Sequence, residues 1–129
     1  MERKYRYTKN EHYPIEQLIF KVRPEDMEEF LRIDHEVWTM GEAMLPELDY
    51  IPFMRKEVWI NETRPGIIQV VFTWKNREDW LKVDSKEIQT RLINLFNSKF
   101  KKSYKLLRCI ENEEDFGIHR ISCFERIEG

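Results

Sequence analysis

The chain has 129 residues, 41% of them hydrophobic and 13% aromatic, which suits a single packed domain. Its 22 lysines and arginines nearly balance its 24 aspartates and glutamates, so no strong overall field attracts nucleic acid or an anionic membrane. No run of about 18 apolar residues is present to span a bilayer, and the charged start of the chain lacks the apolar core of a secretory signal. We therefore expect a cytoplasmic protein whose partners include neither nucleic acid nor a membrane.

The sequence contains two cysteines and three histidines. Cys109 and Cys123 lack the close spacing of a zinc site and are too few for a disulfide framework. The histidines, His12, His35 and His119, are far apart in the sequence and form no ligand set. We expect two reduced structural thiols, no metal site and no bound cofactor.

The first fourteen residues show no apolar periodicity and end at a proline. Such a segment is typical of an arm, and we predict a polar N-terminal arm over 1–14, either mobile or laid across a neighbouring chain. A single domain over 15–129 follows it. The run 15–22 is short and rich in β-branched and aromatic residues, which predicts the first strand.

A helix is predicted over 25–45. Pro24 suits a first helical turn, and the acidic residues after it lie where the helix dipole favours negative charge. Large apolar residues then recur at three- and four-residue spacing until Pro46. Asp34 lies in phase with this apolar stripe, four residues before Trp38, which makes it the most informative polar residue of the sequence.

Two further strands are predicted over 53–60 and 67–74. The segment between them is dense in turn-forming residues, so the two strands should form a hairpin. A short helical piece that contains Trp80 then precedes a helix over 85–100. Each of the two helical starts carries a polar residue suited to capping a helix N-terminus.

The last two predicted strands cover 104–110 and 118–127, with an acidic turn between them. The resulting β-α-β-β-α-β order predicts an α+β, ferredoxin-like fold with an antiparallel sheet, helices on one face and an extra C-terminal strand that extends the sheet edge or reaches a partner chain. The strand over 67–74 is apolar on both faces, which argues against a solvated second face. A homodimer through the sheet face explains this pattern.

Four short segments carry a family resemblance: 15–18 (IEQL), 36–39 (EVWT), 56–59 (KEVW) and 70–80 (VVFTWKNREDW). Over about residues 15–110 the chain resembles the dimeric α+β barrel superfamily that includes antibiotic-biosynthesis-monooxygenase-like proteins. The combination of EVWT with KEVW resembles an uncharacterised bacterial branch of that superfamily.

The resemblance implies a dimeric α+β barrel and a choice among several activities, because the superfamily holds cofactor-independent oxygenases of polycyclic phenols, haem-degrading enzymes, small isomerases or dehydratases, and proteins with no shown chemistry. The haem-degrading members usually place a histidine ligand in the helix after the third strand. The corresponding stretch here, 80–87, contains no histidine, which argues against haem binding of that kind.

Asp34 needs a partner or a cavity, because burying an unpaired carboxylate is strongly unfavourable. Three interpretations stay open. Asp34 could be tied to a backbone amide or to an arginine such as Arg55. It could be a catalytic acid or base, or a ligand-orienting acid, in an active site. The helix could also be rotated so that Asp34 is exposed.

Trp38, Trp59 and Trp74 could converge on one aromatic pocket between helix and sheet, and Glu57 could reach the same pocket. Ordinary core packing is the alternative for these side chains. Two hypotheses follow. The chain could bind or oxidise a small apolar or aromatic molecule in this pocket without a cofactor, with Asp34 as the catalytic residue. Alternatively, it could be a non-catalytic dimeric binding or accessory module.

Overall fold

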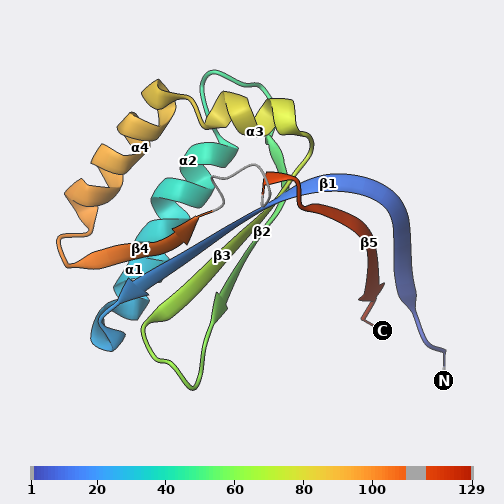
Figure 1. Cartoon of the computed structure of the whole chain (residues 1–129), viewed down its shortest axis with the longest axis horizontal. Helices are drawn as coiled ribbons and strands as arrows, with labels where there is room; N and C mark the ends of the chain where they lie inside the picture. Colours follow the sequence, from blue (N-terminus) through green and yellow to red (C-terminus); the bar gives the residue numbers. More distant parts are fainter. Residues whose placement is uncertain (1, 110–115, 129) are drawn as a thin grey trace.

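The computed structural model describes residues 2–109 and 116–128 (Figure 1). In chain order its elements are β1 (Tyr5–Val22), the 3-10 turn η1 (Pro24–Asp26), α1 (Met27–Ile33), the π-helical turn η2 (Asp34–Thr39), α2 (Met40–Ala43), β2 (Phe53–Ile60), β3 (Ile67–Trp74), α3 (Arg77–Val83), α4 (Lys86–Lys99), β4 (Tyr104–Cys109) and β5 (His119–Arg126). This order confirms the predicted α+β, ferredoxin-like fold with an extra C-terminal strand.

The main sheet has the strand order β2-β3-β1-β4, and its neighbouring strands are antiparallel. The helices cover one face of this sheet (Figure 1). Phe30 of α1 and Phe96 of α4 are almost completely buried and meet edge to face, with ring centroids 5.4 Å apart. Ile68 and Val70 of β3 close this core from the sheet side. None of the helices in the described ranges is long and apolar enough to cross a membrane.

β1 begins ten residues earlier than the strand predicted from the sequence. Its first part, residues 5–14, pairs with β5 of the same chain, and the two form a ribbon that extends beyond the main sheet (Figure 1). The ribbon bends at Asn10 and His12, whose φ angles are 59° and 55°, and the pairing register shifts there. The strand was missed because backbone pairing with β5 requires no apolar pattern. We call this ribbon the β1–β5 arm. The acidic turn predicted before β5 lies largely outside the described residues.

The predicted helix over 25–45 is divided into η1, α1, η2 and α2. Sequence periodicity could not reveal this division because each piece keeps a helical φ/ψ and the apolar stripe runs through all four. α4 begins close to the predicted position, but its N-terminal cap is Ser85, whose hydroxyl oxygen accepts from the Ile88 amide at 3.3 Å. α3 is capped as expected by Asn76, which accepts from the Asp79 amide at 2.7 Å.

β2 contains an irregularity that strict alternation did not predict. The register with β3 shifts between Phe53 and Arg55, as in a β-bulge, which re-aims the side chains on one side of it. Phe53 therefore packs against Phe72 and Trp74 on the helix side. Lys56 points to the same side, with its ammonium 5.3 Å from the Phe72 ring centroid.

Gly66, at the end of the β2–β3 hairpin, tests this packing. Its φ is +94°, and an added Cβ would lie 2.4 Å from the Val22 carbonyl oxygen. Gly66→Ala should lower the free energy of unfolding by about 1–3 kcal/mol, since both the backbone conformation and the contact are unfavourable for alanine. Urea denaturation measures the change. Gly41→Ala is the matched control, because its Cβ meets only the mobile end of the Leu92 side chain. An equal loss in both variants would contradict the argument.

Candidate functional site

Four ionisable side chains from four elements meet between the helices and the sheet. They are Glu16 of β1, Asp34 of η2, Glu42 of α2 and Lys56 of β2, and we call them the buried polar cluster. The side chains of Asp34 and Lys56 are only 5% and 4% exposed, and Glu42 as a residue is 5% exposed. Charged groups are rarely buried in this way unless they are paired or serve a function.

Lys56 is the partner of Asp34. Its Nζ donates to Asp34 Oδ2 at 2.7 Å and to Thr39 Oγ1 at 2.5 Å. Asp34 is therefore buried, which excludes the exposed alternative, and its ion-pair partner is a lysine where an arginine, Arg55, was expected. Arg55 lies elsewhere and contacts Glu125 of β5 at 3.4 Å.

The π-helical turn η2 explains how Asp34 and Thr39 reach the same lysine. The two residues are the first and last of η2. In an α-helix, residues five apart point about 140° away from each other, whereas the wider π-helical turn brings residue i close to residue i+5. The local widening therefore places a carboxylate and a hydroxyl on one side of the helix, both toward β2.

The two glutamates of the cluster have raised pKa values. Burial raises the pKa of Glu16 to about 7, against the opposing effect of a hydrogen bond that Trp74 Nε1 donates to Glu16 Oε1 at 3.1 Å. Burial, with the nearby Glu16, raises the pKa of Glu42 to about 8. Gln89 Nε2 donates to Glu42 Oε1 at 3.3 Å. Glu42 Oε2 is buried and has no hydrogen-bond partner within the described part of the chain.

The tryptophans predicted to form one pocket are separated. Trp74 is 1% exposed and joins the cluster through Glu16, and it stacks on Trp80 at 6.0 Å between ring centroids. Trp38 is partly buried and packs against Phe96. Trp59 is 51% exposed, and it does not join Trp38 and Trp74 in the core.

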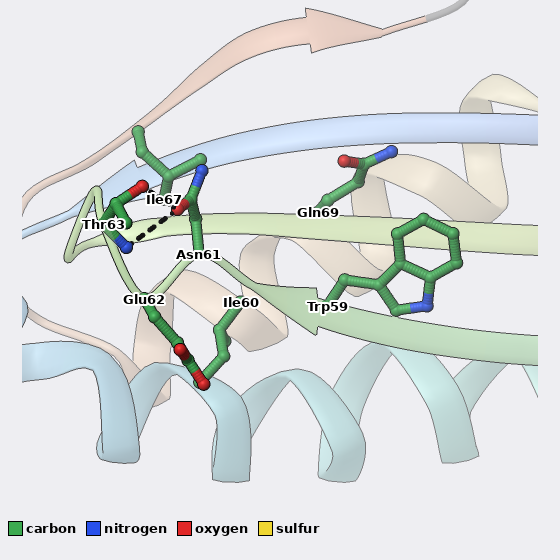
Figure 2. A pocket seen from close by; sticks show the side chains of 7 residues that line it. All are labelled: Trp59, Ile60, Asn61, Glu62, Thr63, Ile67 and Gln69. Carbon is green, nitrogen blue, oxygen red and sulfur yellow. Dashed lines mark hydrogen bonds between the residues drawn. The ribbon is translucent and has the colours of Figure 1, made fainter.

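Trp59 lines a different hollow, at the end of the β2–β3 hairpin (Figure 2). This open hollow has a volume of about 390 Å³, and Gln69, the β3 residue paired with Trp59, lies beside it. Glu57 is adjacent to Lys56 in β2 and therefore points to the opposite face of the sheet from the cluster. Of the predicted site residues, the structure brings together only Asp34 and Trp74 around the cluster.

Sequence reasoning missed Glu16, Glu42 and Lys56, although each left a signal. Glu16 alternates with Leu18 and Phe20 in β1, and Lys56 alternates with Val58 in β2. A charged residue on the apolar face of a strand is the same kind of exception that identified Asp34. Among the described residues, no group of three or more histidine, cysteine or acidic side chains could hold a metal ion.

Comparisons with known proteins give no sequence match, since neither a protein-family model nor a curated protein matches the chain. Solved structures do match. A candidate antibiotic biosynthesis monooxygenase from Caulobacter crescentus has a TM-score of 0.51 at 10% identity, covering 80% of this chain and 92% of that chain. A conserved protein of unknown function from Bacteroides thetaiotaomicron, described as a possible oxidoreductase, has a TM-score of 0.50 at 12% identity, covering 79% and 99%.

A point mutant of SnoaB, a cofactor-independent oxygenase from Streptomyces nogalater, has a TM-score of 0.50 at 10% identity, covering 79% of this chain and 97% of that chain. Identities this low establish the fold and leave the activity open. The chain therefore has the α+β fold of the antibiotic-biosynthesis-monooxygenase-like proteins, as its sequence pattern predicted.

Proposed function

We propose that the chain binds a small aromatic molecule with an ionisable hydroxyl group at the buried polar cluster and exchanges a proton with it. The observation that carries this proposal is Glu42 Oε2, a buried polar atom without a hydrogen-bond partner in the described ranges. Leaving such an atom unsatisfied costs about 1–3 kcal/mol. A ligand oxygen at this position would remove that cost.

The charges of the cluster suit proton exchange near neutral pH. Glu42, with a pKa of about 8, can give a proton to a ligand oxygen and take it back, because the most effective general acids and bases have a pKa near the working pH. Lys56 has three ammonium hydrogens, two of which point to Asp34 and Thr39. The third could donate to the oxygen of a phenolate. In this arrangement Asp34 holds Lys56 in position.

The finer form of the proposal is oxidation of the ligand without a cofactor. SnoaB, which shares the fold, is described as a cofactor-independent oxygenase. Removal of the hydroxyl proton makes the aromatic ring electron-rich, and dioxygen is then the oxidant. One oxygen atom enters the substrate at a CH₂ carbon as a carbonyl group, and the other leaves as water with the two hydrogens of that carbon.

Entry of a ligand requires the helical side of the cluster to open. η2 lies between α1, with 7 residues, and α2, with 4 residues. Helices this short are not stable without their packing contacts. The segment from Asp34 to Ala43 is therefore the part of the wall that can move away from β2.

Oxygen uptake with 1,8-dihydroxyanthrone as the probe tests the proposal. Asp34→Asn and Glu42→Gln should each lower the rate by about 10- to 100-fold, because one loses the counter-charge of Lys56 and the other loses the exchangeable proton. Asp49→Asn, at an exposed position, is the matched control and should keep the wild-type rate. Uptake no faster than in buffer for the wild type would refute the oxidation. Wild-type rates in both cluster variants would refute the assigned site.

The pH dependence of stability tests the state of Glu42 independently of any ligand. Its pKa is raised from 4.5 to about 8 in the folded chain, so between these values the unfolded chain has lost the proton that the folded chain keeps. Stability is therefore greatest below pH 4.5 with respect to this group and falls as the pH rises toward 8. Glu42→Gln removes this loss and should be more stabilising at pH 8 than at pH 5, by on the order of 1–3 kcal/mol.

Urea denaturation at the two pH values measures this difference. Glu87→Gln, at an exposed position on α4, serves as the control and should follow the wild type at both values. If Glu42→Gln also followed the wild type, Glu42 would not be a protonated buried acid.

We also propose a homodimer that forms through the sheet face opposite the helices. Met54 and Trp59 of β2 are each 51% exposed, and Phe124 of the β1–β5 arm is 68% exposed. Exposed apolar side chains in such numbers are typical of association surfaces. A non-catalytic dimeric module remains the alternative function, and it predicts this dimer together with wild-type stability and no turnover in the assays above.

Light scattering after size-exclusion chromatography tests the dimer. The wild type should have twice the chain mass of 16.0 kDa, and Trp59→Glu should shift the protein toward the monomer because it places a charge in the apolar interface. Leu81→Glu changes an exposed leucine on α3 and should leave the mass unchanged. A monomeric wild type at micromolar concentration would contradict the proposal.

A further inference from the structure

A second pocket lies outside the buried polar cluster, where the β1–β5 arm approaches the start of β2. Its volume is about 230 Å³. Arg6 and Tyr13 of β1, Arg55 of β2, and Arg120 of β5 line it, together with two glutamates, Glu11 and Glu125. We call it the arm pocket. Its described walls all come from one chain, and Figure 1 shows the two arm strands running together beyond the main sheet.

The lining of the arm pocket has more positive than negative groups, with three guanidinium groups facing two carboxylates. Glu125 lies 3.6 Å from Arg6 and 3.4 Å from Arg55. Glu11 accepts a hydrogen bond from Arg120 Nη2 at 2.6 Å and another from the Thr8 hydroxyl. The internal pairs therefore leave one positive charge without a counter-charge in the lining.

The arginines of the arm pocket also keep unused donors. A guanidinium group has five N–H donors, and the contacts of Arg55 and Arg120 with the glutamates each use one nitrogen. Arg120 Nε is buried and has no hydrogen-bond partner among the described residues. A surface pair in the same molecule behaves differently, since Arg91 binds Glu47 through two nitrogens at 2.8 Å and 3.0 Å.

The remaining walls are aromatic and apolar. The Arg120 guanidinium carbon lies 5.6 Å from the centroid of the Tyr13 ring, and Lys75 Nζ lies 5.9 Å from the same centroid. Met54 adds an apolar side chain. Positive groups held on an aromatic ring beside an apolar wall suit a ligand with a negative end and a flat or apolar body.

We propose that the arm pocket binds a small organic carboxylate, with the carboxylate between Arg120 and Arg55 and the apolar part against Tyr13 and Met54. A guanidinium group matches the planar geometry of a carboxylate, and Arg120 Nε gains the acceptor that it lacks. The volume is below the roughly 300–1,000 Å³ of most drug-sized sites, so the ligand is small. This site is separate from the proposed proton-exchange site and does not depend on it.

Isothermal titration calorimetry with benzoate tests this proposal on the full chain, in a low-salt buffer free of carboxylate and phosphate. Benzoate should bind saturably, and benzamide, a neutral molecule of the same shape, should bind at least about tenfold more weakly. Arg120→Gln should weaken benzoate binding by about tenfold or more. Arg126→Gln is the matched control on the same strand, since its side chain is 82% exposed, and it should bind as the wild type does.

Circular dichroism establishes whether Arg120→Gln keeps the fold. If it does not, Arg55→Gln on the opposite wall decides, with the same expected loss. No saturable binding below about 10 mM benzoate, equal binding of benzamide, or wild-type binding in both arginine variants would overturn the proposal. Tighter binding of inorganic phosphate than of benzoate would overturn the carboxylate assignment. Glu42→Gln should bind benzoate normally, so failure of the proton-exchange site cannot be mistaken for failure of this one.

Discussion

The ion pair between Lys56 and Asp34 fixes how the helical layer sits on the sheet. Lys56 comes from β2, at the edge of the main sheet, and Asp34 begins the π-helical turn between α1 and α2. A buried charge left without its partner is destabilising by about 3–5 kcal/mol, so neither residue can leave the contact while the core stays closed. The position of η2 over β2 follows from this contact, and the position of Glu42 follows from η2.

The same contact accounts for the unusual protonation of the neighbouring glutamates. The cluster has three carboxyl groups and one ammonium group, and the ammonium is hydrogen-bonded to Asp34. Glu16 and Glu42 therefore lack a close cation of their own, and burial favours their neutral forms. A site that is almost electrically neutral at physiological pH results, although all four of its members are ionisable. Such a site can accept an uncharged aromatic molecule without desolvating additional charges.

The parts of this architecture that follow a regular pattern could be predicted from the sequence. The order of elements, the hairpin of β2 and β3, and the importance of Asp34 all follow from periods of two or of 3.6 residues. The π-helical turn could not be predicted, because one widened turn barely changes an apolar stripe. The bulge at Phe53 reversed the face of one aromatic residue for the same reason. Lys56 was passed over because a lysine on an edge strand is usually solvated, and only the position of Asp34 reveals otherwise.

β1 is a single strand of 18 residues that belongs to two ladders, one with β3 and β4 and one with β5. Asn10 and His12, with left-handed backbone angles, separate the two ladders, and the paired register is interrupted between Lys9 and Tyr13. The interruption divides the molecule into two cooperative units, because fraying that starts in the arm meets a break in the hydrogen bonding before it reaches the core. The arm can thus open and close as one body while the sheet beneath the helices stays intact.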